Sequence, residues 1–361
     1  ENGMKLSSFK RTYVFPFQYD VPSYTTEFIK NTSVVKRYIK FVKRYLYLVF
    51  KRQNNLEVDK IHQHQHRILW INKSAPSLGD SLMDLSSRVM LNGKEVVLFT
   101  DVKNAHIYRQ DHIFSKVVTS VKQLKDHQYD LVIIDSYSTR SIKIKSQVQP
   151  KTPFVGMYGY YNGPEVNRVL FSFHRMNRLL GYQESEARIN STARATMNFA
   201  KGATIEPSIQ HLDKYITIAL GGEWDYRIYD KWFDVIDGLF ARSSVLNIVL
   251  VGSSNAMEIA NELMSVYSQK NIVNIVDQLT FVQTANVIKG SQILLCCDGG
   301  LMHAANAVGT PVVPLFARLT PEMQLTYCIA AFSSYDELNV KGIPAERILD
   351  RYDQACKLLE I

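Results

Sequence analysis

Residues 293–315 read ILLCCDGGLMHAANAVGTPVVPL and place a strand, a turn, a helix and a second strand in immediate succession. The apolar run before Asp298 predicts a buried strand, and Gly299 and Gly300 permit the tight turn from which a helix of small residues starts. Residues 311–315 predict the strand that follows this helix. Such a succession is typical of a parallel sheet covered by helices.

The same alternation extends in two arrays over most of the chain. In the first array we expect strands at 67–72, 95–100, 130–135 and 153–158, with a helix over 80–91. In the second we expect further strands at 215–220, 247–251 and 271–275, with helices over 231–240, 256–267 and 280–288. Two such arrays predict an α/β protein with two doubly wound, Rossmann-like sheets facing each other across a cleft. Ligands of these sheets bind outside the carboxyl ends of the strands.

Composition places the chain among globular proteins and excludes disorder as its dominant state. It has 361 residues, of which 46% are hydrophobic and 21% charged, and this length is typical of two domains. Four Cys, two of them adjacent, do not form the pattern of a disulfide framework, so a reducing cytosol is expected.

The formal net charge of +8 is concentrated near the N-terminus, because residues 1–66 hold 12 Lys and Arg against 5 Asp and Glu. Within this extension, residues 32–52 predict one helix with an apolar stripe of Val35, Tyr38, Ile39, Val42, Tyr45, Leu46 and Val49. Two interpretations stay open for the helix. It packs on its own domain with a solvated basic face, or it contacts an anionic membrane surface or a phosphorylated acceptor. Nucleic acid is disfavoured, because no binding motif accompanies the charge.

The turn at Asp298 is the first candidate site. The free N–H groups and positive end of the helix that starts there favour an anion such as a diphosphate. Taken alone, however, Asp298 would be read as a cap of that helix, and His303 as a structural histidine.

The wider context favours the binding site, because residues 298–317, DGGLMHAANAVGTPVVPLFA, resemble the signature of family 9 glycosyltransferases, the ADP-heptose heptosyltransferases of bacterial lipopolysaccharide synthesis. That signature runs approximately D-[ST]-G-[LP]-M-H-L-A-A-A-L-G-x-P-V-V-x-L-F-G. The resemblance implies that the donor sugar and diphosphate are held by Asp298, Gly299, Gly300, Leu301, Met302 and His303. Gly299 departs from the usual hydroxyl residue, and Ala317, followed by Arg318, departs from the usual glycine. Arg318 is either an ordinary surface arginine or a contact for a phosphate or an acidic acceptor.

Residues 70–82, WINKSAPSLGDSL, resemble the family's second landmark, a strand and a loop that ends in Gly-Asp before a helix. By this resemblance Asp80 is the general base that deprotonates the acceptor hydroxyl, and Lys73 contacts the acceptor or a phosphate. Inversion at an anomeric carbon needs one carboxylate on the face opposite the leaving group. The alternative role of Asp80, a helix cap, is compatible with catalysis but would weaken the base.

Residues 221–232, GGEWDYRIYDKW, resemble the loop that brings hydroxyl groups and a cation to the donor phosphates just before a tryptophan. Here Gly221 and Gly222 open the loop, and either Lys231 or Arg227 supplies the cation. The match is partial, because the family's lysine generally lies two residues before the tryptophan, where this chain has an aspartate.

A further loop begins at Gly252 and resembles the family's nucleoside-facing loop, with Glu258 either on the ribose or base or simply solvating its helix. The chain contains no Asp-x-Asp. This favours neutralisation of the phosphates by backbone N–H groups and basic side chains over a chelated metal. We therefore expect no metal site and no cofactor beyond the nucleotide-sugar donor.

Together these features predict the GT-B architecture. We expect a basic helical extension at 1–66, an acceptor-binding domain at 67–195, a nucleotide-sugar domain at 210–343 and, at 344–361, a helix that packs back across the junction. The expected activity is inverting transfer of a heptosyl group from ADP-heptose to a lipooligosaccharide or related surface glycan. The alternatives are the same fold with another nucleotide sugar, or a catalytically weak glycan-binding or assembly partner. The family implies a cytoplasmic enzyme, peripheral on the bacterial inner membrane if residues 32–52 touch lipid.

Overall fold

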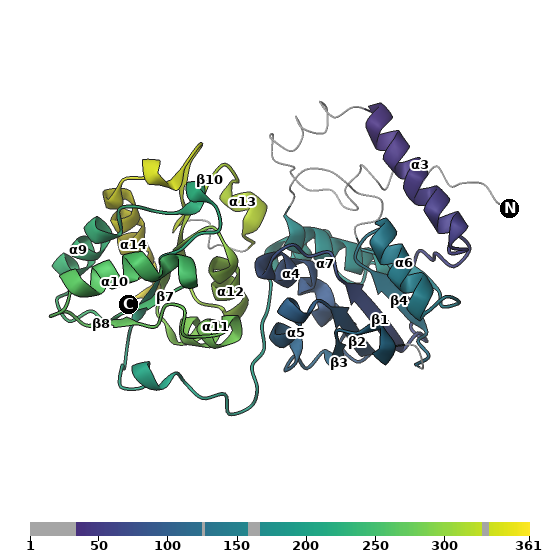
Figure 1. The fold of residues 1–361 in the computed structure, drawn as a ribbon, viewed down its shortest axis with the longest axis horizontal. Helices are drawn as coiled ribbons and strands as arrows, with labels where there is room; N and C mark the ends of the chain where they lie inside the picture. The colour runs from purple at the N-terminus through teal and green to yellow at the C-terminus, as the bar shows by residue number, and fades with distance from the viewer. Residues whose placement is uncertain (1–33, 125–126, 158–166, 327–331) are drawn as a thin grey trace. The chain divides into compact units, whose positions relative to one another are not determined.

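The computed structural model describes residues 34–124, 127–157, 167–326 and 332–361, without the side chains of residues 34, 37 and 38. The chain divides into two compact units between Ala193 and Arg194. Each unit is built on its own parallel sheet (Figure 1).

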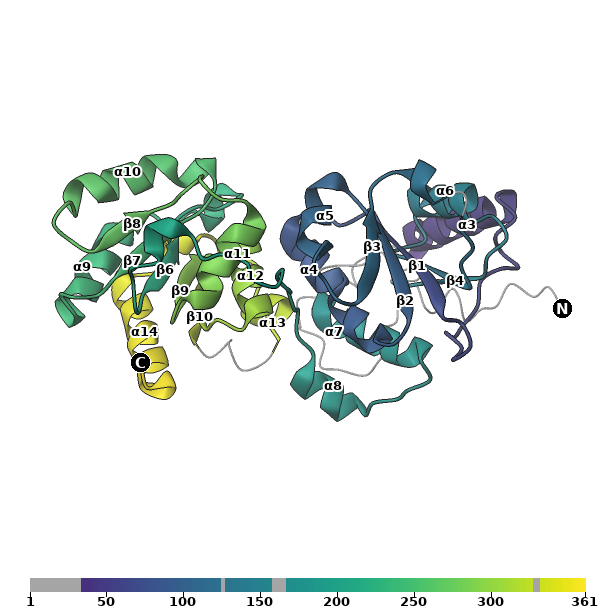
Figure 2. The same cartoon turned by 90° about the horizontal axis from the view of Figure 1, so that it is seen from below.

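The sheet of the first unit has five parallel strands in the order β3-β2-β1-β4-β5. Their bounds are β1 Arg67–Asn72, β2 Glu95–Thr100, β3 Phe114–Val118, β4 Leu131–Ile134 and β5 Phe154–Gly156. Its helices are α3 Val34–Phe50, α4 Leu78–Asp84, α5 Val102–Tyr108, α6 Thr139–Val148, α7 Arg168–Leu179 and α8 Glu186–Thr192, with short 3₁₀ turns at Ser86–Leu91 and Val121–Gln123. Figure 2 shows α3 and α6 on one side of the sheet and α4 and α5 on the other.

The sheet of the second unit has six parallel strands in the order β11-β10-β9-β6-β7-β8. Their bounds are β6 Ile216–Ala219, β7 Ile248–Val251, β8 Ile272–Asn274, β9 Leu294–Cys297, β10 Val312–Ala317 and β11 Ser334–Asp336. The helices are α9 Trp232–Arg242, α10 Met257–Val266, α11 Phe281–Gly290, α12 Gly300–Val308, α13 Pro321–Gln324 and α14 Ala345–Leu359. The 3₁₀ turns are η3 Pro207–Ile209, η4 Asp225–Arg227, η5 Ser254–Ala256 and η7 Val340–Gly342. Helix α14 packs against α9 and buries Ile348 and Leu349 in the core of this unit.

The strands read as near-continuous apolar runs because both faces of each sheet are covered. In the first unit alternate residues such as Leu69, Phe99 and Ile134 join one core cluster, which also takes Phe41 and Leu48 from α3. These two buried side chains attach α3 to the unit. The same order of strands brings the loops after β1, β2 and β4 to one sheet edge, and the loops after β6, β9 and β10 to one edge of the other sheet.

The structure differs from the sequence analysis at three points. The single helix over 80–91 is wrong, because the α-helix ends at Asp84 and a 3₁₀ turn follows Leu85. Strands β3 and β11 were not expected. Helix α3 does pack on its own unit, as one interpretation of residues 32–52 expected, but mainly through Phe41 and Leu48, whereas Val35, Ile39, Leu46 and Val49 of the named stripe are exposed. Among the described helices, none is long and apolar enough to cross a bilayer.

Candidate functional site

Asp80 lies in the first turn of α4, at the carboxyl edge of the first sheet. The helix starts there because Ser77 is its N-cap: the Ser77 hydroxyl accepts the Asp80 N–H at 3.1 Å and donates to Asp80 Oδ2 at 2.8 Å. Arg168, the first residue of α7, places Nη1 3.5 Å from Asp80 Oδ1. The Asp80 side chain remains 22% exposed, so an acceptor hydroxyl can approach its carboxylate.

Arg168 is itself held in place by a second carboxylate on α4. Its Nε and Nη2 donate to Asp84 Oδ1 and Oδ2 at 2.7 and 2.6 Å, the two-pronged geometry that fixes a guanidinium most firmly. Arg168 therefore links positions 80 and 84, one helical turn apart. Arg168 was not predicted, because no sequence motif marks it.

Asp135, directly after β4, fixes the loop that follows β1. Its carboxylate accepts the N–H groups of Lys73 and Ser74 at 3.0 and 2.8 Å and the Ser141 hydroxyl at 2.6 Å. Burial raises the pKa of this carboxyl group, against the effect of these hydrogen bonds. Its position at the carboxyl end of a predicted strand is the sequence signal that marks Asp135.

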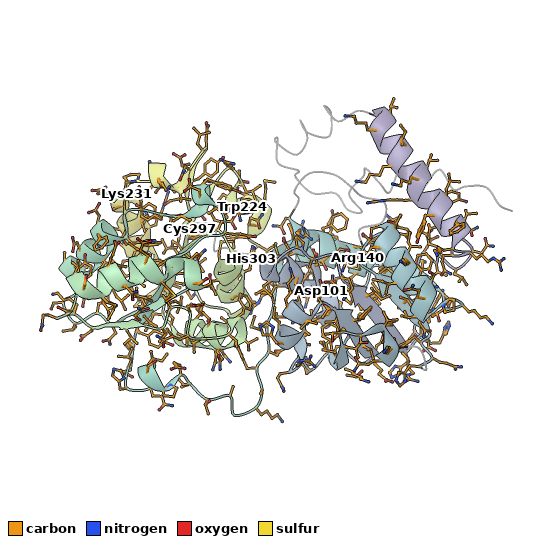
Figure 3. The ribbon with its side chains drawn as sticks, viewed as in Figure 1. Asp101, Arg140, Trp224, Lys231, Cys297 and His303 are labelled. Atoms are coloured by element: carbon orange, nitrogen blue, oxygen red, sulfur yellow. The ribbon has the colours of Figure 1, made fainter. Side chains whose placement is uncertain are left out.

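The Lys73 side chain is paired inside the unit. Its ammonium lies 3.1 Å from Asp101 and over the Phe99 ring, 4.8 Å from the centroid. Arg140 approaches the same Asp101 carboxylate at 3.8 Å, and Figure 3 shows the two side chains near each other. Arg140 is largely exposed, so it is the more accessible of the two cations.

In the second unit, the predicted turn lies where the sequence placed it. Asp298 follows β9, Gly299 is the N-cap of α12, and Gly300 is the first residue of that helix. His303 is buried one turn further along, and Met302 is part of the core beneath the turn. Leu301 is half-buried against the same core. Met302 therefore offers a ligand its backbone rather than its side chain.

Arg227 contacts Asp298 across this edge of the sheet. Its Nη2 lies 3.4 Å from Asp298 Oδ2, and only 14% of the Arg227 side chain is exposed. Within the described part of the chain, the buried Arg227 Nε has no hydrogen-bond partner, so the guanidinium does not use all of its donors in this structure. The structure thus joins two residues that the sequence analysis had assigned separately.

The loop after β6 has no room for a side chain at Gly221 or Gly222. A Cβ at Gly222 would lie 2.4 Å from the Arg227 carbonyl oxygen, and one at Gly221 would lie 2.5 Å from Asn255 Oδ1. Asn255 Nδ2 also donates to the Gly222 carbonyl at 2.7 Å. Asn255, which the sequence analysis missed, therefore ties this loop to the one that begins at Gly252.

Three other predicted donor residues have different surroundings. The Lys231 ammonium donates to the Lys341 carbonyl and lies 3.1 Å from Asp230. Gly252 has a φ of +145°, which an L side chain rarely adopts, and Glu258 is exposed in the first turn of α10. Whether these residues contact a donor stays a prediction.

An arginine and a tyrosine stack where the loops after β6 and β10 meet. The Arg318 guanidinium lies 3.9 Å from the centroid of the Tyr226 ring, and the Arg227 guanidinium lies 5.4 Å from the same centroid. Arg318 has a φ of +66°, an uncommon conformation for a residue with a side chain. Tyr226 was missed, although it stands next to Arg227 in the quoted loop.

Cys297 precedes Asp298 and is labelled with Trp224, Lys231 and His303 in Figure 3. Burial raises the pKa of the Cys297 thiol to about 12, so it stays protonated and does not act as a nucleophile at neutral pH. In the described ranges, no three His, Cys, Asp or Glu side chains are grouped as a metal site.

One protein-family model matches part of the chain. Residues 159–327 match the model of glycosyltransferase family 9 (heptosyltransferase). No curated protein sequence matches the chain.

Several solved structures share the fold. The Escherichia coli ADP-heptose lps heptosyltransferase II is 14% identical, with a TM-score of 0.63 over 82% of this chain and 100% of that one. A family 9 glycosyl transferase from Veillonella parvula is 12% identical, with a TM-score of 0.67 over 84% and 100%. The E. coli heptosyltransferase WaaC with ADP is 16% identical, with a TM-score of 0.64 over 80% and 99%. These likenesses confirm the predicted α/β class and GT-B architecture.

The residues of the Asp298 turn, the family model and the shared fold agree. The chain therefore resembles family 9 glycosyltransferases over residues 159–327 and shares the fold of solved heptosyltransferases.

Proposed function

We propose that this chain transfers a heptosyl group, with inversion, from ADP-heptose to a sugar of a lipooligosaccharide or related surface glycan. The observation that carries the proposal is the Asp298-Gly299-Gly300 turn at the start of α12, with Arg227 against it. A helix start and an arginine suit a diphosphate. Heptosyltransferases of the same fold have been solved with ADP and with ADP-2-deoxy-2-fluoro heptose, which supports the adenine nucleotide and the heptose.

In the proposed reaction Asp80 accepts the proton of the acceptor hydroxyl. The acceptor oxygen then forms a bond to the anomeric carbon, while the bond from that carbon to the phosphate oxygen breaks and ADP leaves. Ser77 and Arg168 hold the Asp80 carboxylate in a fixed orientation, as general-base catalysis requires.

Backbone and side-chain groups of the protein offset the negative charge that develops on the leaving diphosphate. The free N–H groups at the start of α12 and the Arg227 guanidinium act on the phosphate oxygens. Arg227 fits this role better than Lys231, whose ammonium is already engaged by the Lys341 carbonyl and Asp230. We propose accordingly that transfer needs neither a metal ion nor a cofactor.

The test is Asp80→Asn compared with Glu95→Gln. Glu95 is the first residue of β2, at the opposite sheet edge, and is a partly exposed carboxylate like Asp80. We expect Asp80→Asn to lower kcat by about 10²–10⁴-fold with ADP binding preserved. Glu95→Gln should retain full turnover. Equal activity of the two variants would remove Asp80 as the base, and ADP-heptose turnover that stops with EDTA would refute the metal-free reaction.

A second nucleotide sugar is the competing function, favoured by Gly299 in place of the usual hydroxyl residue. A thermal-shift screen of ADP-, UDP- and GDP-sugars separates the two. Preference for UDP or GDP would overturn the heptose assignment, and no binding at all would favour a glycan-binding partner without catalysis. We further propose that the acceptor is presented at the inner face of a bacterial inner membrane, in contact with residues 32–52.

A further inference from the structure

Helix α3 exposes an apolar stripe that the fold of its own unit does not use. Val35, Ile39, Leu46 and Phe50 are 66%, 60%, 59% and 75% exposed. These positions are four, seven and four residues apart and so lie along one side of the helix. The side that packs on the unit is a different one, marked by Phe41 and Leu48, which are almost fully buried.

A basic flank borders this stripe. At 100° per residue, Lys36, Lys40 and Lys43 follow the stripe on the side away from Phe41. The helix contains no Asp or Glu over its whole length. A cross-section of α3 therefore has three sectors: one buried in the protein, one exposed and apolar, and one cationic.

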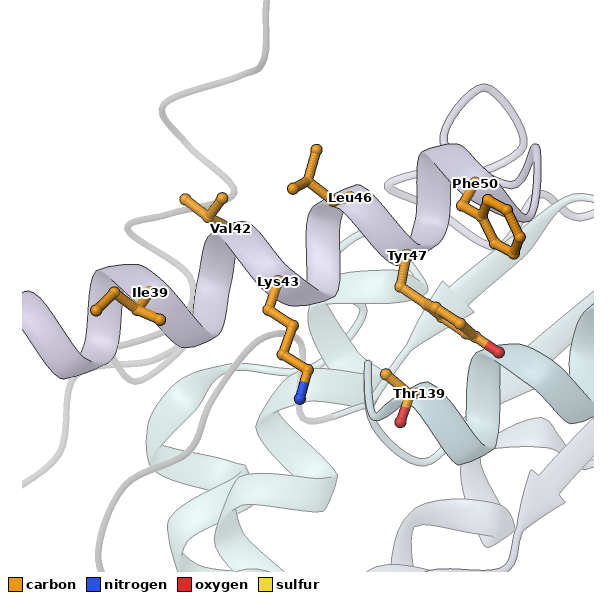
Figure 4. A pocket seen from close by; sticks show the side chains of 7 residues that line it. All are labelled: Ile39, Val42, Lys43, Leu46, Tyr47, Phe50 and Thr139. Atoms are coloured by element: carbon orange, nitrogen blue, oxygen red, sulfur yellow. The ribbon is translucent and has the colours of Figure 1, made fainter.

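The apolar stripe continues into an open groove of about 560 Å³ between α3 and the start of α6. Figure 4 shows Lys43 and Tyr47 reaching from α3 toward Thr139, while Val42 and Leu46 point away from α6. The groove lining is almost entirely apolar, so the helix offers a hydrophobic surface with a lysine at its border.

We infer that α3 lies in the plane of an anionic lipid surface, with Val35, Ile39, Leu46 and Phe50 inserted among acyl chains and the lysine flank among headgroups. Apolar residues beside lysines, without carboxylates, form the pattern of an interfacial helix. The lysine stems can lie along the apolar layer while their ammonium groups reach the phosphates. This inference deepens the proposed placement of the acceptor at a membrane and rests on it.

Charge favours an anionic lipid surface over two other occupants of the stripe, a second copy of α3 and residues 1–33 of the same chain. A second copy of α3 would bring its own lysines against these and repel. Residues 1–33 hold four Lys and Arg against three Asp and Glu, so they offer no negative surplus to match the flank. An anionic lipid surface complements both sectors at once, with acyl chains for the apolar stripe and phosphates for the lysines.

The helix is fastened firmly enough to carry the enzyme to that surface. Beyond Phe41 and Leu48, Gln53 just after α3 accepts the Lys145 ammonium of α6 at 2.5 Å and donates to the Pro150 carbonyl at 3.1 Å. Binding of α3 to lipid would therefore hold the unit that contains Asp80 at the membrane surface.

The experiment is co-sedimentation of the full chain with phosphatidylcholine vesicles, with and without phosphatidylglycerol. We expect strong binding only when phosphatidylglycerol is present. Ile39→Ser/Leu46→Ser should weaken it by about tenfold or more, and Lys36→Gln/Lys43→Gln by roughly fivefold for each charge removed. The matched control is Val245→Ser/Leu338→Ser, which removes two side chains in the second unit that are 76% and 74% exposed.

Three outcomes would overturn the inference. One is equal binding by the α3 variants and the control. Another is binding that is lost on deleting residues 1–33 but unchanged by the α3 substitutions. The third is a dimer on size-exclusion chromatography that Ile39→Ser/Leu46→Ser dissociates, which would assign the stripe to a second copy. ADP binding by the same samples reports on the donor site separately, so failure of the transferase proposal and failure of the lipid contact are distinguishable.

Discussion

Gly299 allows a sharp test of the donor turn, because this chain has glycine where the family usually has a hydroxyl residue. A Cβ at Gly299 would meet nothing within 4 Å, and its φ of 170° is extended backbone open to any residue. Gly299→Ser should therefore fit without strain. The new hydroxyl stands at the N-cap of α12, where no side chain now caps the helix.

The expected gain has two parts. A serine N-cap is a few tenths of a kcal/mol better than glycine, and loss of glycine's freedom in the unfolded chain adds about 0.4–1 kcal/mol. The sum of about 0.5–1.5 kcal/mol corresponds to a rise in Tm of about 1–6 °C for a unit of this size. With ADP bound, the hydroxyl can turn to a phosphate oxygen, so affinity should hold or rise by up to about fivefold.

The assay is thermal denaturation with and without ADP, alongside Gly222→Ala as the contrasting variant. At Gly222 the added Cβ would lie 2.4 Å from the Arg227 carbonyl oxygen, so the loop must shift, at about 1–3 kcal/mol of stability and with weaker ADP binding. A fall in Tm for Gly299→Ser, or ADP binding weakened tenfold, would show that a ligand or the backbone needs that space and would refute the reasoning.

Three further predictions concern charged side chains. Arg168→Gln should lower kcat by about 10–100-fold with ADP affinity unchanged, because Arg168 orients Asp80. Steady-state kinetics and an ADP titration measure the two quantities. A loss of ADP affinity with kcat unchanged would contradict this role of Arg168. Burial lowers the pKa of Lys145 to about 7, so between about pH 7 and 10 the native state binds fewer protons than the unfolded state and wild-type stability rises with pH. Relative to Lys145→Met this rise should be about 1.4 kcal/mol per pH unit in urea unfolding, and a pH-independent difference would refute it. A double-mutant cycle of Arg227→Met and Asp298→Asn should give a coupling of about 1–3 kcal/mol in the free energy of unfolding. A coupling near zero would mean that the contact between Arg227 and Asp298, at 3.4 Å, does not hold the loop after β6 in place.

The elements around Asp298 could be predicted because local signals agree there. An apolar strand, two glycines and a helix of small residues leave little choice of structure, and β9, α12 and β10 lie where the sequence placed them. Strand β3 was missed because its sequence, FSKVV, mixes exposed polar with apolar residues at the edge of the sheet. Edge strands lack the continuous apolar run that marked the central ones.

The contact face of α3 was beyond the sequence for a different reason. Helical spacing identifies an apolar stripe but not what covers it, and here Phe41 and Leu48, outside the named stripe, make most of the contact, with Val42 of the stripe beside them. Contacts between distant residues were equally beyond reach: nothing in the sequence pairs Arg168 with Asp80, or Arg227 with Asp298. Such pairs depend on which loops the strand order brings to one sheet edge.

The choice between Lys231 and Arg227 shows what the structure adds to a motif. In sequence both are cations in the loop after β6, and Lys231 has the advantage of standing next to the matched tryptophan. In the structure Lys231 donates to the Lys341 carbonyl, whereas Arg227 lies against Asp298 and, among the described residues, does not use all of its donors. A guanidinium can keep one N–H group on a carboxylate while others turn to a phosphate, which an ammonium on a flexible stem does with less geometric control. Arg227 can therefore stay fixed by the turn while it receives the diphosphate that the same turn binds.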